Sequence, residues 1–376
     1  MPTSGSLRLL WLSDSSNPHT VRWVRALAAR GHEVLVYSLT EPRDDALGSL
    51  PGVSVESAGI DPLLAQGSAP GAWHKIAYLK AVPRIVQLHR AFRADVCHAH
   101  YASSYGVLGI LARLRPFAVS IWGSDVYVTP NRSHIHRWLV SQVLHRADLV
   151  LSTSWTMRQQ GLSLANVSIA VVPFGIDMAR FAPRERARGE PRDLIVGTVK
   201  ALEPKYGIDY LIRAFSILVK NSGLERLRLV IAGDGSHRAE LERLAQHLGV
   251  EGVIQFLGSV RNEVVDEVYR AFDVAVFPSI EDSESFGVSA VEAQACGIPV
   301  IASRVGGLPE VVADRQTGLI VPPCNEHELA SAIAELLVDA ARRSRMGAAG
   351  RQHVALQYDL EHCVDELQRQ YATLLA

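Results

Sequence analysis

Short apolar runs alternate with amphipathic stretches along the chain, and this alternation predicts strands joined by helices. In the first half we expect strands at residues 7–13, 33–39, 95–99, 118–122 and 148–152, with helices at 21–30, 103–114 and 134–146. In the second half we expect strands at residues 194–199, 228–232, 253–257, 274–278, 299–302 and 318–321, with helices between them and from 326 onward. Because such alternation is typical of doubly wound parallel sheets, the sequence predicts an α/β protein.

The chain is expected to form two domains with a boundary near residue 174. At about 150 residues per domain, a length of 376 residues corresponds to two domains. Val-Pro-Phe-Gly at 172–175 ends a strand with two helix- and strand-breaking residues, and the polar stretch 184–192 follows. We therefore expect domains at 1–174 and 175–355, and a helix at 356–376 that packs back on the first domain. Domains of this kind bind ligands at the carboxyl ends of their strands, so we expect a cleft between them.

Composition narrows the classes of function. Hydrophobic residues make up 48% of the chain and the formal net charge is −1, which excludes a disordered chain and a protein built mainly to coat nucleic acid. No apolar run approaches the roughly 20 residues that span a bilayer. The apolar run at 9–12 is expected to be the first core strand rather than a secretory signal. The 4 cysteines have no C-x-x-C spacing, so we expect buried thiols and a cytoplasmic location.

One segment, residues 73–93, is basic and amphipathic. It contains no acidic residue and carries Lys75, Lys80, Arg84, Arg90 and Arg93 among apolar side chains. Two interpretations stay open: peripheral contact with an anionic membrane or a phosphorylated acceptor, or a surface helix whose basic groups are solvated. Pro83 is expected to interrupt this helix, which weakens the membrane interpretation.

The segment from 274 to 295 carries the clearest chemical signal. A predicted strand leads into the loop Glu284-Ser285-Phe286-Gly287, and a helix is expected from Val288. A helix N-terminus after a parallel strand suits a phosphate, and Gly287 has no side chain to block close approach. We expect Glu292 two turns into the helix on the same face as Glu284, where it would accept hydrogen bonds from ribose hydroxyls.

These residues resemble a known family. Glu284-x7-Glu292 and the downstream Gly-Gly-Leu-Pro-Glu at 306–310 look like the donor-site signature of retaining glycosyltransferases of the GT-B fold, family GT4. The wider match covers 197–207, Ala-Gly-Asp-Gly at 232–235, which includes Gly233, then 256–258 and 273–278. The resemblance implies two Rossmann-like domains facing each other across a cleft. It also implies transfer of a sugar from a nucleotide diphosphate to an acceptor hydroxyl.

Two lysines are assigned to the donor diphosphate. The resemblance places an arginine and a lysine where this chain has Lys200 and Lys205, and both contact the diphosphate in the family. Ammonium groups stabilise the charge that develops on a leaving diphosphate. Lys200 replaces an arginine and therefore lacks its bidentate fork. The alternative is that both lysines are merely solvated.

In the first domain the candidates are polar and aromatic residues that follow predicted strands. Asn17, His19 and Thr20 follow the first strand, and either acceptor contact or plain helix capping is open for them. The resemblance has a histidine where this chain has Trp122, and a G-x-D element ending at Asp125 that lines the cleft. Asp125 is expected to orient the acceptor, or else to cap a turn.

His98 and His100 end a strand and point to the same side. A metal site there would need further ligands that the sequence does not supply, so His100 is interpreted as a cleft residue or a packed histidine.

The sequence therefore predicts a metal-independent retaining glycosyltransferase with no cofactor beyond its UDP- or GDP-sugar donor. The acceptor is a glycan, a lipid-linked sugar or a small natural product, and neither base, sugar nor acceptor is fixed. Two alternatives are an epimerase of the same fold and a catalytically silent nucleotide-sugar-binding subunit.

Overall fold

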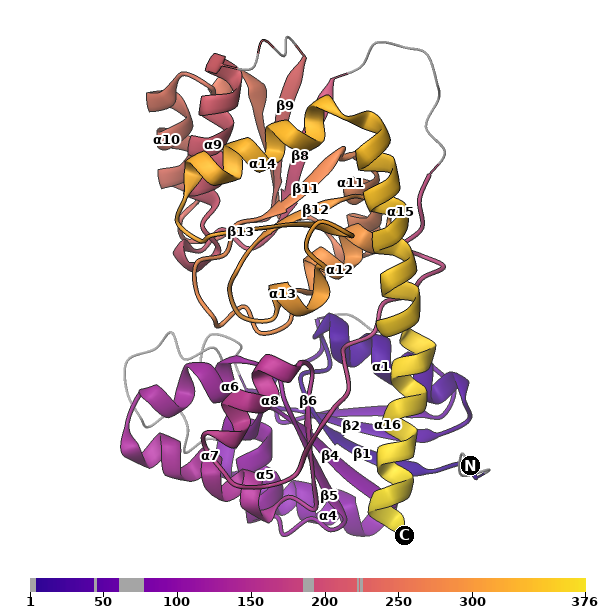
Figure 1. Ribbon diagram of the computed structural model, residues 1–376. Helices are drawn as coiled ribbons and strands as arrows, with labels where there is room; N and C mark the ends of the chain where they lie inside the picture. The colour runs from indigo at the N-terminus through magenta and orange to yellow at the C-terminus, as the bar shows by residue number, and fades with distance from the viewer. Residues whose placement is uncertain (1–4, 44–45, 61–77, 185–192, 222, 224–225) are drawn as a thin grey trace. The chain divides into compact units, whose positions relative to one another are not determined.

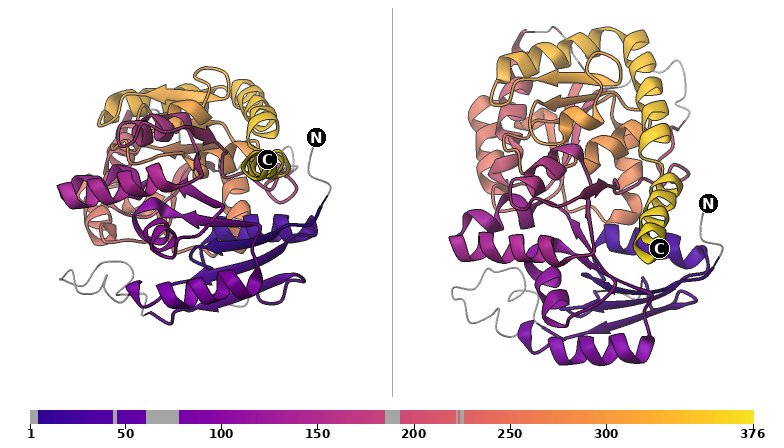
Figure 2. Two further views of the ribbon diagram at one scale, coloured as in Figure 1. Left: turned by 90° about the horizontal axis from the view of Figure 1, so that it is seen from below. Right: turned by 60° about the horizontal axis from the view of Figure 1, so that its bottom comes forward.

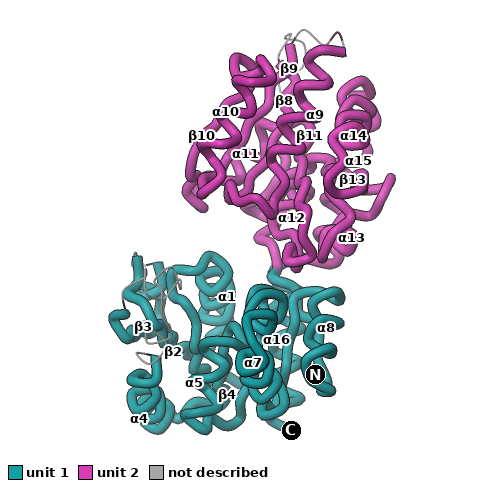
Figure 3. The backbone as a smooth tube through the Cα atoms, turned by 90° about the vertical axis from the view of Figure 1, so that its left-hand side faces the viewer, with its two compact units in different colours: residues 1–174, 360–376 teal, residues 175–359 magenta. Residues whose placement is uncertain are grey.

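The computed structural model describes residues 5–43, 46–60, 78–184, 193–221, 223 and 226–376. Residues 73–77 of the basic segment and 185–192 of the predicted linker lie outside these ranges. The chain forms two compact units (Figure 3). Unit 1 contains residues 1–174 and 360–376, and unit 2 contains residues 175–359.

Unit 1 is built on a parallel sheet of seven strands in the order β3-β2-β1-β4-β5-β6-β7. The strands are β1 Arg8–Leu12, β2 Glu33–Ser38, β3 Val53–Ser57, β4 Val96–His100, β5 Phe117–Ile121, β6 Leu149–Ser152 and β7 Ile169–Val171. The order runs outward from β1 to β3, then restarts at β4 on the other side. The reversal between β1 and β4 is the place where a doubly wound sheet binds ligands, beyond the carboxyl ends of its strands.

Helices cover both faces of this sheet (Figure 1). They are α1 Pro18–Ala29, α4 Val82–Phe92, α5 Gly106–Leu111, α6 Ser124–Tyr127, α7 His134–Arg146, α8 Trp155–Leu162 and α16 Leu360–Leu375, with a π-helical turn η1 at Tyr101–Tyr105. Because side chains alternate along a strand, β1 contributes to two cores. Leu9 and Trp11 pack with α1 and α16, whereas Leu10 and Leu12 pack with α4, α5 and α7. The last helix of the chain thus completes a core that begins at the first strand.

Unit 2 has a parallel sheet of six strands in the order β10-β9-β8-β11-β12-β13. The strands are β8 Leu194–Val199, β9 Leu227–Ala232, β10 Ile254–Gly258, β11 Val274–Phe277, β12 Val300–Ser303 and β13 Gly318–Val321. Its helices are α9 Ile208–Asn221, α10 Arg238–Leu248, α11 Val265–Ala271, α12 Val288–Ala295, α13 Leu308–Val311, α14 Glu326–Val338 and α15 Ala340–Gln357. The helices α9, α10 and α14 cover one core, and the strand order reverses between β8 and β11.

The α/β prediction is confirmed, with differences at several element ends. Helix α1 begins at Pro18, ahead of the predicted start, because the Asn17 side chain caps it and proline is tolerated in a first turn. The expected interruption at Pro83 is wrong for the same reason, since this proline lies in the first turn of α4. No helix in the described part of the chain has both the length and the hydropathy needed to cross a membrane.

Candidate functional site

The predicted donor residues of unit 2 gather where its strand order reverses. Lys200 follows β8, Gly233 follows β9, Glu284 lies in the loop after β11, and Gly306 lies in the loop after β12. These strands are consecutive neighbours in the sheet, so the carboxyl ends of all four bring their loops together. Residues that are more than 100 positions apart in sequence therefore share one site.

Lys200 and Glu284 form a buried ion pair at this site. The Lys200 Nζ atom lies 2.5 Å from Glu284 Oε2, and the two side chains are 15% and 8% exposed. The Ser279 hydroxyl donates to the same carboxylate oxygen at 3.4 Å. Sequence analysis selected both charged residues but did not predict their contact. The pair places one positive and one negative group in contact with each other beyond the carboxyl ends of the strands.

A tyrosine holds the two predicted lysines together. The Nζ atoms of Lys200 and Lys205 lie 4.5 and 4.9 Å from the centroid of the Tyr206 ring. The negative face of an aromatic ring attracts ammonium groups and so offsets part of their mutual repulsion. The Ile280 N–H also donates to the Lys205 carbonyl at 2.9 Å, which joins the loop after β8 to the loop after β11. Tyr206 was missed, although its position directly after Lys205 was a usable signal.

Gly233 and Gly306 fix these loops by close backbone contact. Gly233 has φ +136°, and a Cβ atom there would lie 1.8 Å from the Lys200 carbonyl oxygen. A Cβ atom on Gly306 would lie 2.1 Å from the Glu284 carbonyl oxygen. Gly233 thus positions the backbone that carries Lys200, a structural role that its assignment to donor binding had not specified.

Gly287 is favoured by its backbone conformation and packing, in addition to the predicted close approach of a phosphate, which stays a prediction. Its φ is +90°, a conformation that favours glycine, and a Cβ atom would lie 2.8 Å from Leu308 Cδ2. Helix α12 begins at Val288, directly after this residue, and no side chain caps it. The first N–H groups of a helix have no partner within the helix, so this end can receive an anion.

The predicted placement of Glu284 and Glu292 on one helical face is wrong. Glu284 lies in the loop before α12, and the left-handed turn at Gly287 separates it from the helix. Glu292 lies about one turn into α12. It is buried, and its Oε2 atom accepts a hydrogen bond from Tyr269 at 3.2 Å.

The remaining residues of the donor motif belong mainly to the frame of the site. Phe286 is buried, and its ring packs edge-on against Tyr358 at 5.5 Å. Ser285 lies beside it, and a Cβ atom on Gly307 would lie 2.5 Å from the Ser285 carbonyl oxygen. These contacts hold the loop that carries Glu284 against the end of α15 and against the loop after β12.

In unit 1 the predicted His100 is part of a buried hydrogen-bonded chain at the β1/β4 reversal. His100 Nδ1 and Ser13 Oγ lie 2.8 Å apart, and Ser13 Oγ and Thr20 Oγ1 lie 2.7 Å apart. His100 is 2% exposed, and burial holds its pKa well below the usual value. These contacts favour the packed-histidine interpretation for His100.

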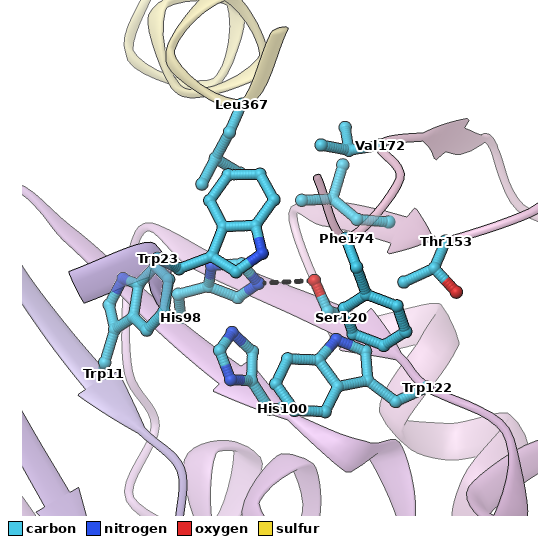
Figure 4. Close-up of a pocket in the computed structure, with 11 residues that line it drawn as sticks. Trp11, Trp23, His98, His100, Ser120, Trp122, Thr153, Val172, Phe174 and Leu367 are labelled. Carbon is cyan, nitrogen blue, oxygen red and sulfur yellow. Dashed lines mark hydrogen bonds between the residues drawn. The ribbon is translucent and has the colours of Figure 1, made fainter. Parts of the chain in front are cut away.

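Aromatic rings enclose this histidine (Figure 4). Trp122 stacks on His100 with centroids 4.1 Å apart, and Phe174 packs edge-on against Trp122 at 5.2 Å. The cavity among these rings has a volume of about 20 Å³, enough for about one water molecule. The cavity is too small to admit a sugar ring.

The Asp125 carboxylate accepts hydrogen bonds from backbone N–H groups of its own loop and of the turn η1. It is fully buried and accepts hydrogen bonds from the N–H groups of Ala102 and Gly123 at 2.9 Å and of Trp122 at 3.2 Å. Desolvation raises its pKa, and the backbone donors oppose that rise. This geometry favours turn capping over contact with an acceptor.

Two roles were left open for the loop before α1, helix capping and acceptor contact, and its residues differ in which role their contacts favour. The Asn17 side chain accepts from the His19 N–H at 2.9 Å, which is a helix cap. His19 is partly exposed, and its ring stacks on Phe174 with centroids 4.0 Å apart. Its Nδ1 atom is buried and has no hydrogen-bond partner among the described residues. Desolvation, aided by Arg22, lowers the pKa of His19 to about 3.

Both ring nitrogens of His98 lie within hydrogen-bond distance of other side chains. Its Nδ1 lies 2.6 Å from the Tyr371 hydroxyl and its Nε2 lies 2.8 Å from Ser120 Oγ. Within the described ranges, no three His, Cys, Asp or Glu side chains are grouped so that they could hold a metal ion.

Comparison with known proteins identifies the family to which this chain is similar. The family model "Glycosyl transferases group 1" matches residues 182–353, and "Glycosyl transferase 4-like" matches residues 8–154. The chain is 31% identical over 373 residues to the D-inositol 3-phosphate glycosyltransferase of Actinosynnema mirum, covering 90% of this chain and 87% of the relative.

Two solved structures have the same fold. Sucrose-phosphate synthase from Thermosynechococcus elongatus matches with a TM-score of 0.77 at 22% identity, over 98% of this chain and 99% of that protein. Anabaena HepE in complex with UDP and glucose matches with a TM-score of 0.77 at 20% identity, over 98% and 100% of the two chains. Both domains of the fold are therefore covered, and the chain belongs to the glycosyl transferases group 1 family, as a GT4-type glycosyltransferase of the GT-B fold.

Proposed function

We propose that the protein transfers a hexosyl group from a nucleoside diphosphate sugar to an acceptor hydroxyl, with retention of anomeric configuration and without a divalent cation. The observation that carries the proposal is the pairing of Lys200 with Glu284 beside Lys205 and Tyr206, where the strand order of unit 2 reverses. Because the chain belongs to a glycosyltransferase family, we assign this site to sugar transfer from the donor.

In this proposal the diphosphate binds between the two ammonium groups and the start of α12. Lys205 and Lys200 carry the positive charge, and the backbone N–H groups at Phe286–Val288, at the uncapped start of α12, supply further donors. Lys200 is already 2.5 Å from a carboxylate, so its charge becomes fully available to the diphosphate only when Glu284 turns towards the sugar. Glu292 would accept hydrogen bonds from the ribose hydroxyls.

The transfer step follows from the charges of these groups. The bond between the anomeric carbon and the diphosphate oxygen breaks, and a bond to the acceptor oxygen forms on the same face of the sugar. The acceptor's proton passes to the departing phosphate oxygen, so no protein base is required. Two lysines and a helix N-terminus stabilise the diphosphate as it leaves, and Glu284 stabilises positive charge on the sugar ring.

The comparisons suggest which ligands to test first. HepE, which has the same fold, was crystallised with UDP and glucose, so UDP-hexoses come before GDP-hexoses. The relatives are named D-inositol 3-phosphate glycosyltransferases, so inositol 3-phosphate is the first acceptor. In unit 1, His19 is the residue we assign to acceptor contact, because the residue is partly exposed and its buried Nδ1 atom has no hydrogen-bond partner among the described residues.

The test is a transfer assay in EDTA with UDP- and GDP-hexoses, inositol 3-phosphate and a panel of other hydroxyl acceptors. We expect a glycosylated product whose anomeric configuration, read by NMR, matches that of the donor. Lys205→Ala should lower kcat/KM by about 100-fold, the usual loss when one preorganised charge-stabilising group is removed. Lys220→Ala, an exposed lysine of α9, is the matched control and should leave kcat/KM unchanged.

Two results would overturn the proposal. Conversion of the donor to its epimer in the absence of acceptor would favour the epimerase. Absence of transfer with every donor, combined with tight nucleotide binding, would favour a silent binding subunit.

A further inference from the structure

Unit 1 contains a large apolar groove that the proposed transfer reaction does not use. It is lined by residues of α5 and α7 and by Tyr78 and Leu79, and it has a volume of about 470 Å³. This volume falls within the range of about 300–1,000 Å³ typical of ligand sites in proteins. Carbon atoms dominate the groove wall, which includes Val107, Leu111 and Leu139. We call these residues, with Trp138, the apolar groove.

The rim of the apolar groove exposes large hydrophobic side chains. Leu79, Leu111 and Trp138 line it and are 48%, 48% and 57% exposed. Val128 and Ile135, also exposed, each directly precede a residue that lines the groove. Single exposed hydrophobic residues need no explanation, but a cluster around a cavity marks a surface that binds something apolar.

The chain segment that contains α5 and α7 has more basic than acidic residues. Residues 96–147 contain one acidic residue, Asp125, and five arginines, at 113, 115, 132, 137 and 146. Asp125 is fully buried, so it contributes nothing to the charge of the surface. Arg115 is paired with Asp148, whereas Arg113, Arg132 and Arg146 are exposed and form no ion pair with any described residue. Arg146 itself lines the groove.

We propose that this face binds the surface of an anionic phospholipid membrane, with acyl chains in the apolar groove and lipid phosphates against Arg113, Arg132 and Arg146. An exposed tryptophan beside arginines is suited to the interface between hydrocarbon and headgroups. The absence of exposed acidic groups across 96–147 fits a uniformly negative partner, since a protein partner is usually met by charges of both signs.

The groove is lined in part by Tyr78 and Leu79 of the basic segment at 73–93, but the arginines proposed to contact lipid lie outside that segment. In that segment Arg84 donates to both carboxylate oxygens of Glu56, at 2.7 to 2.9 Å, so its charge is neutralised within the protein. The proposal is also independent of the transfer reaction, because vesicle binding requires neither donor nor acceptor.

The first experiment is co-sedimentation of the full chain with phosphatidylcholine vesicles that contain or lack phosphatidylglycerol. We expect sedimentation with the anionic vesicles only, and its loss at about 0.5 M salt, where screening acts over a few ångströms. Arg132→Glu and Arg146→Glu should each weaken binding at least fivefold, the change expected for one charge near an anionic surface. Arg213→Glu, an exposed arginine of unit 2, is the matched control and should bind as the unaltered chain does.

The second experiment tests whether the groove, and not only the charge, contacts lipid. Vesicles with brominated acyl chains should quench the fluorescence of Trp138, and this part of the quenching should vanish in Trp138→Phe. Trp155, 61% exposed in the same unit but outside the groove, is the control: Trp155→Phe should leave the quenching unchanged. Leu111→Ser should weaken vesicle binding without changing the thermal unfolding temperature.

Three results would overturn the proposal. They are failure to sediment with anionic vesicles, equal binding to neutral vesicles, and dimers in solution that Leu111→Ser dissociates, which would make the groove a contact between copies of this chain. Activity in the transfer assay would survive any of these results, so the two proposals fail separately.

Discussion

The ion pair of Lys200 and Glu284 combines a structural and a functional role in two side chains. Both groups are largely removed from water, so each depends on the other for compensation of its charge. Removal of one partner leaves a buried charge unpaired, whereas removal of both charges leaves two neutral side chains. Stability and activity should therefore respond differently to single and double substitutions.

We expect Lys200→Met to destabilise the protein by about 3 kcal/mol, because Glu284 would remain buried without its partner. Adding Glu284→Gln should restore most of that stability, while transfer activity should stay below one hundredth of the original, the scale of loss for a charge-stabilising group. Urea unfolding and the transfer assay on the two single variants and the double variant measure both quantities. Recovery of activity in the double variant would show that the pair serves stability alone.

The buried His98 should make unit 1 sensitive to acid. Burial lowers its pKa to about 3, whereas the unfolded chain binds a proton near the ordinary value of about 6.5. The unfolded state therefore takes up a proton at pH 5 that the folded state excludes, and stability falls as the pH falls below about 6.5. The effect between pH 7 and pH 5 is about 2 kcal/mol.

Urea unfolding at pH 7 and pH 5 checks this expectation. In His98→Asn the loss of stability between the two pH values should be smaller by about 2 kcal/mol. His134→Asn, which alters an exposed histidine at the start of α7, should show the pH dependence of the unaltered chain. An unchanged pH dependence in His98→Asn would mean that folding does not lower the pKa of His98.

For individual residues, the sequence identified the charged side chains of the donor site but not their contacts. Lys200, Lys205 and Glu284 were selected by motif, yet their pairing depends on β8 and β11 being neighbours in the sheet, which periodicity does not reveal. In unit 1 the sequence could not separate a carboxylate that faces a ligand from one that bonds its own loop. The contacts of Asp125 favour the second kind, because the N–H groups of Trp122 and Gly123 in its own loop donate to its carboxylate.

Among the elements, the loops after strands depend on glycines that permit backbone contact. Gly233 and Gly249 both have positive φ, but only Gly233 lies against another segment. A side chain at Gly249, just after α10, would meet nothing within 4 Å. The two positions therefore separate the cost of a left-handed backbone from the cost of a steric clash.

We expect Gly249→Ala to cost about 1 kcal/mol, the penalty of the left-handed conformation. Gly233→Ala should cost at least about 3 kcal/mol in addition to weakening donor binding, because its Cβ would displace the carbonyl of Lys200. Thermal unfolding and nucleotide titration of both variants provide the comparison. Similar stabilities for the two would mean that the loop after β8 adjusts freely.

Strongly patterned elements were predicted to within a residue or two, and weakly patterned ones were not. Strand β13 and helix α7 have the predicted bounds, because clear breaks flank their periodic segments. Strand β3 was missed because it lies at the edge of its sheet, where it pairs with one strand only and just one of its five residues, Val53, is buried. The start of α12 was clear, but the bend at Gly287 that separates it from Glu284 was not.

The whole molecule consists of two units, one of which is completed by the end of the chain. Leu367 and Tyr371 of α16 are buried in the core that also contains Leu9 and Trp11 of β1. Stability of unit 1 therefore depends on residues that follow all of unit 2 in sequence. The helix pairs with α1, and Figure 2 shows it in two further views.

We expect Leu367→Ala to lower the free energy of unfolding of unit 1 by about 3 kcal/mol, as is usual for a buried leucine. Leu375→Ala in the same helix is the control, because that side chain is exposed, and its effect should stay within about 0.5 kcal/mol. Hydrogen exchange of the amides in β1 reports on unit 1 specifically. Equal protection in the two variants would contradict a structural role for the helix.

Calorimetric titration of UDP and GDP into the full chain, in buffer with EDTA, tests most directly whether two lysines and a helix N-terminus hold the donor. The account predicts that at least one nucleotide binds with measurable heat, that EDTA leaves its Kd unchanged, and that Lys205→Ala weakens it at least tenfold while Lys220→Ala does not. Absence of heat with both nucleotides, or binding that EDTA abolishes and Mg²⁺ restores, would contradict it.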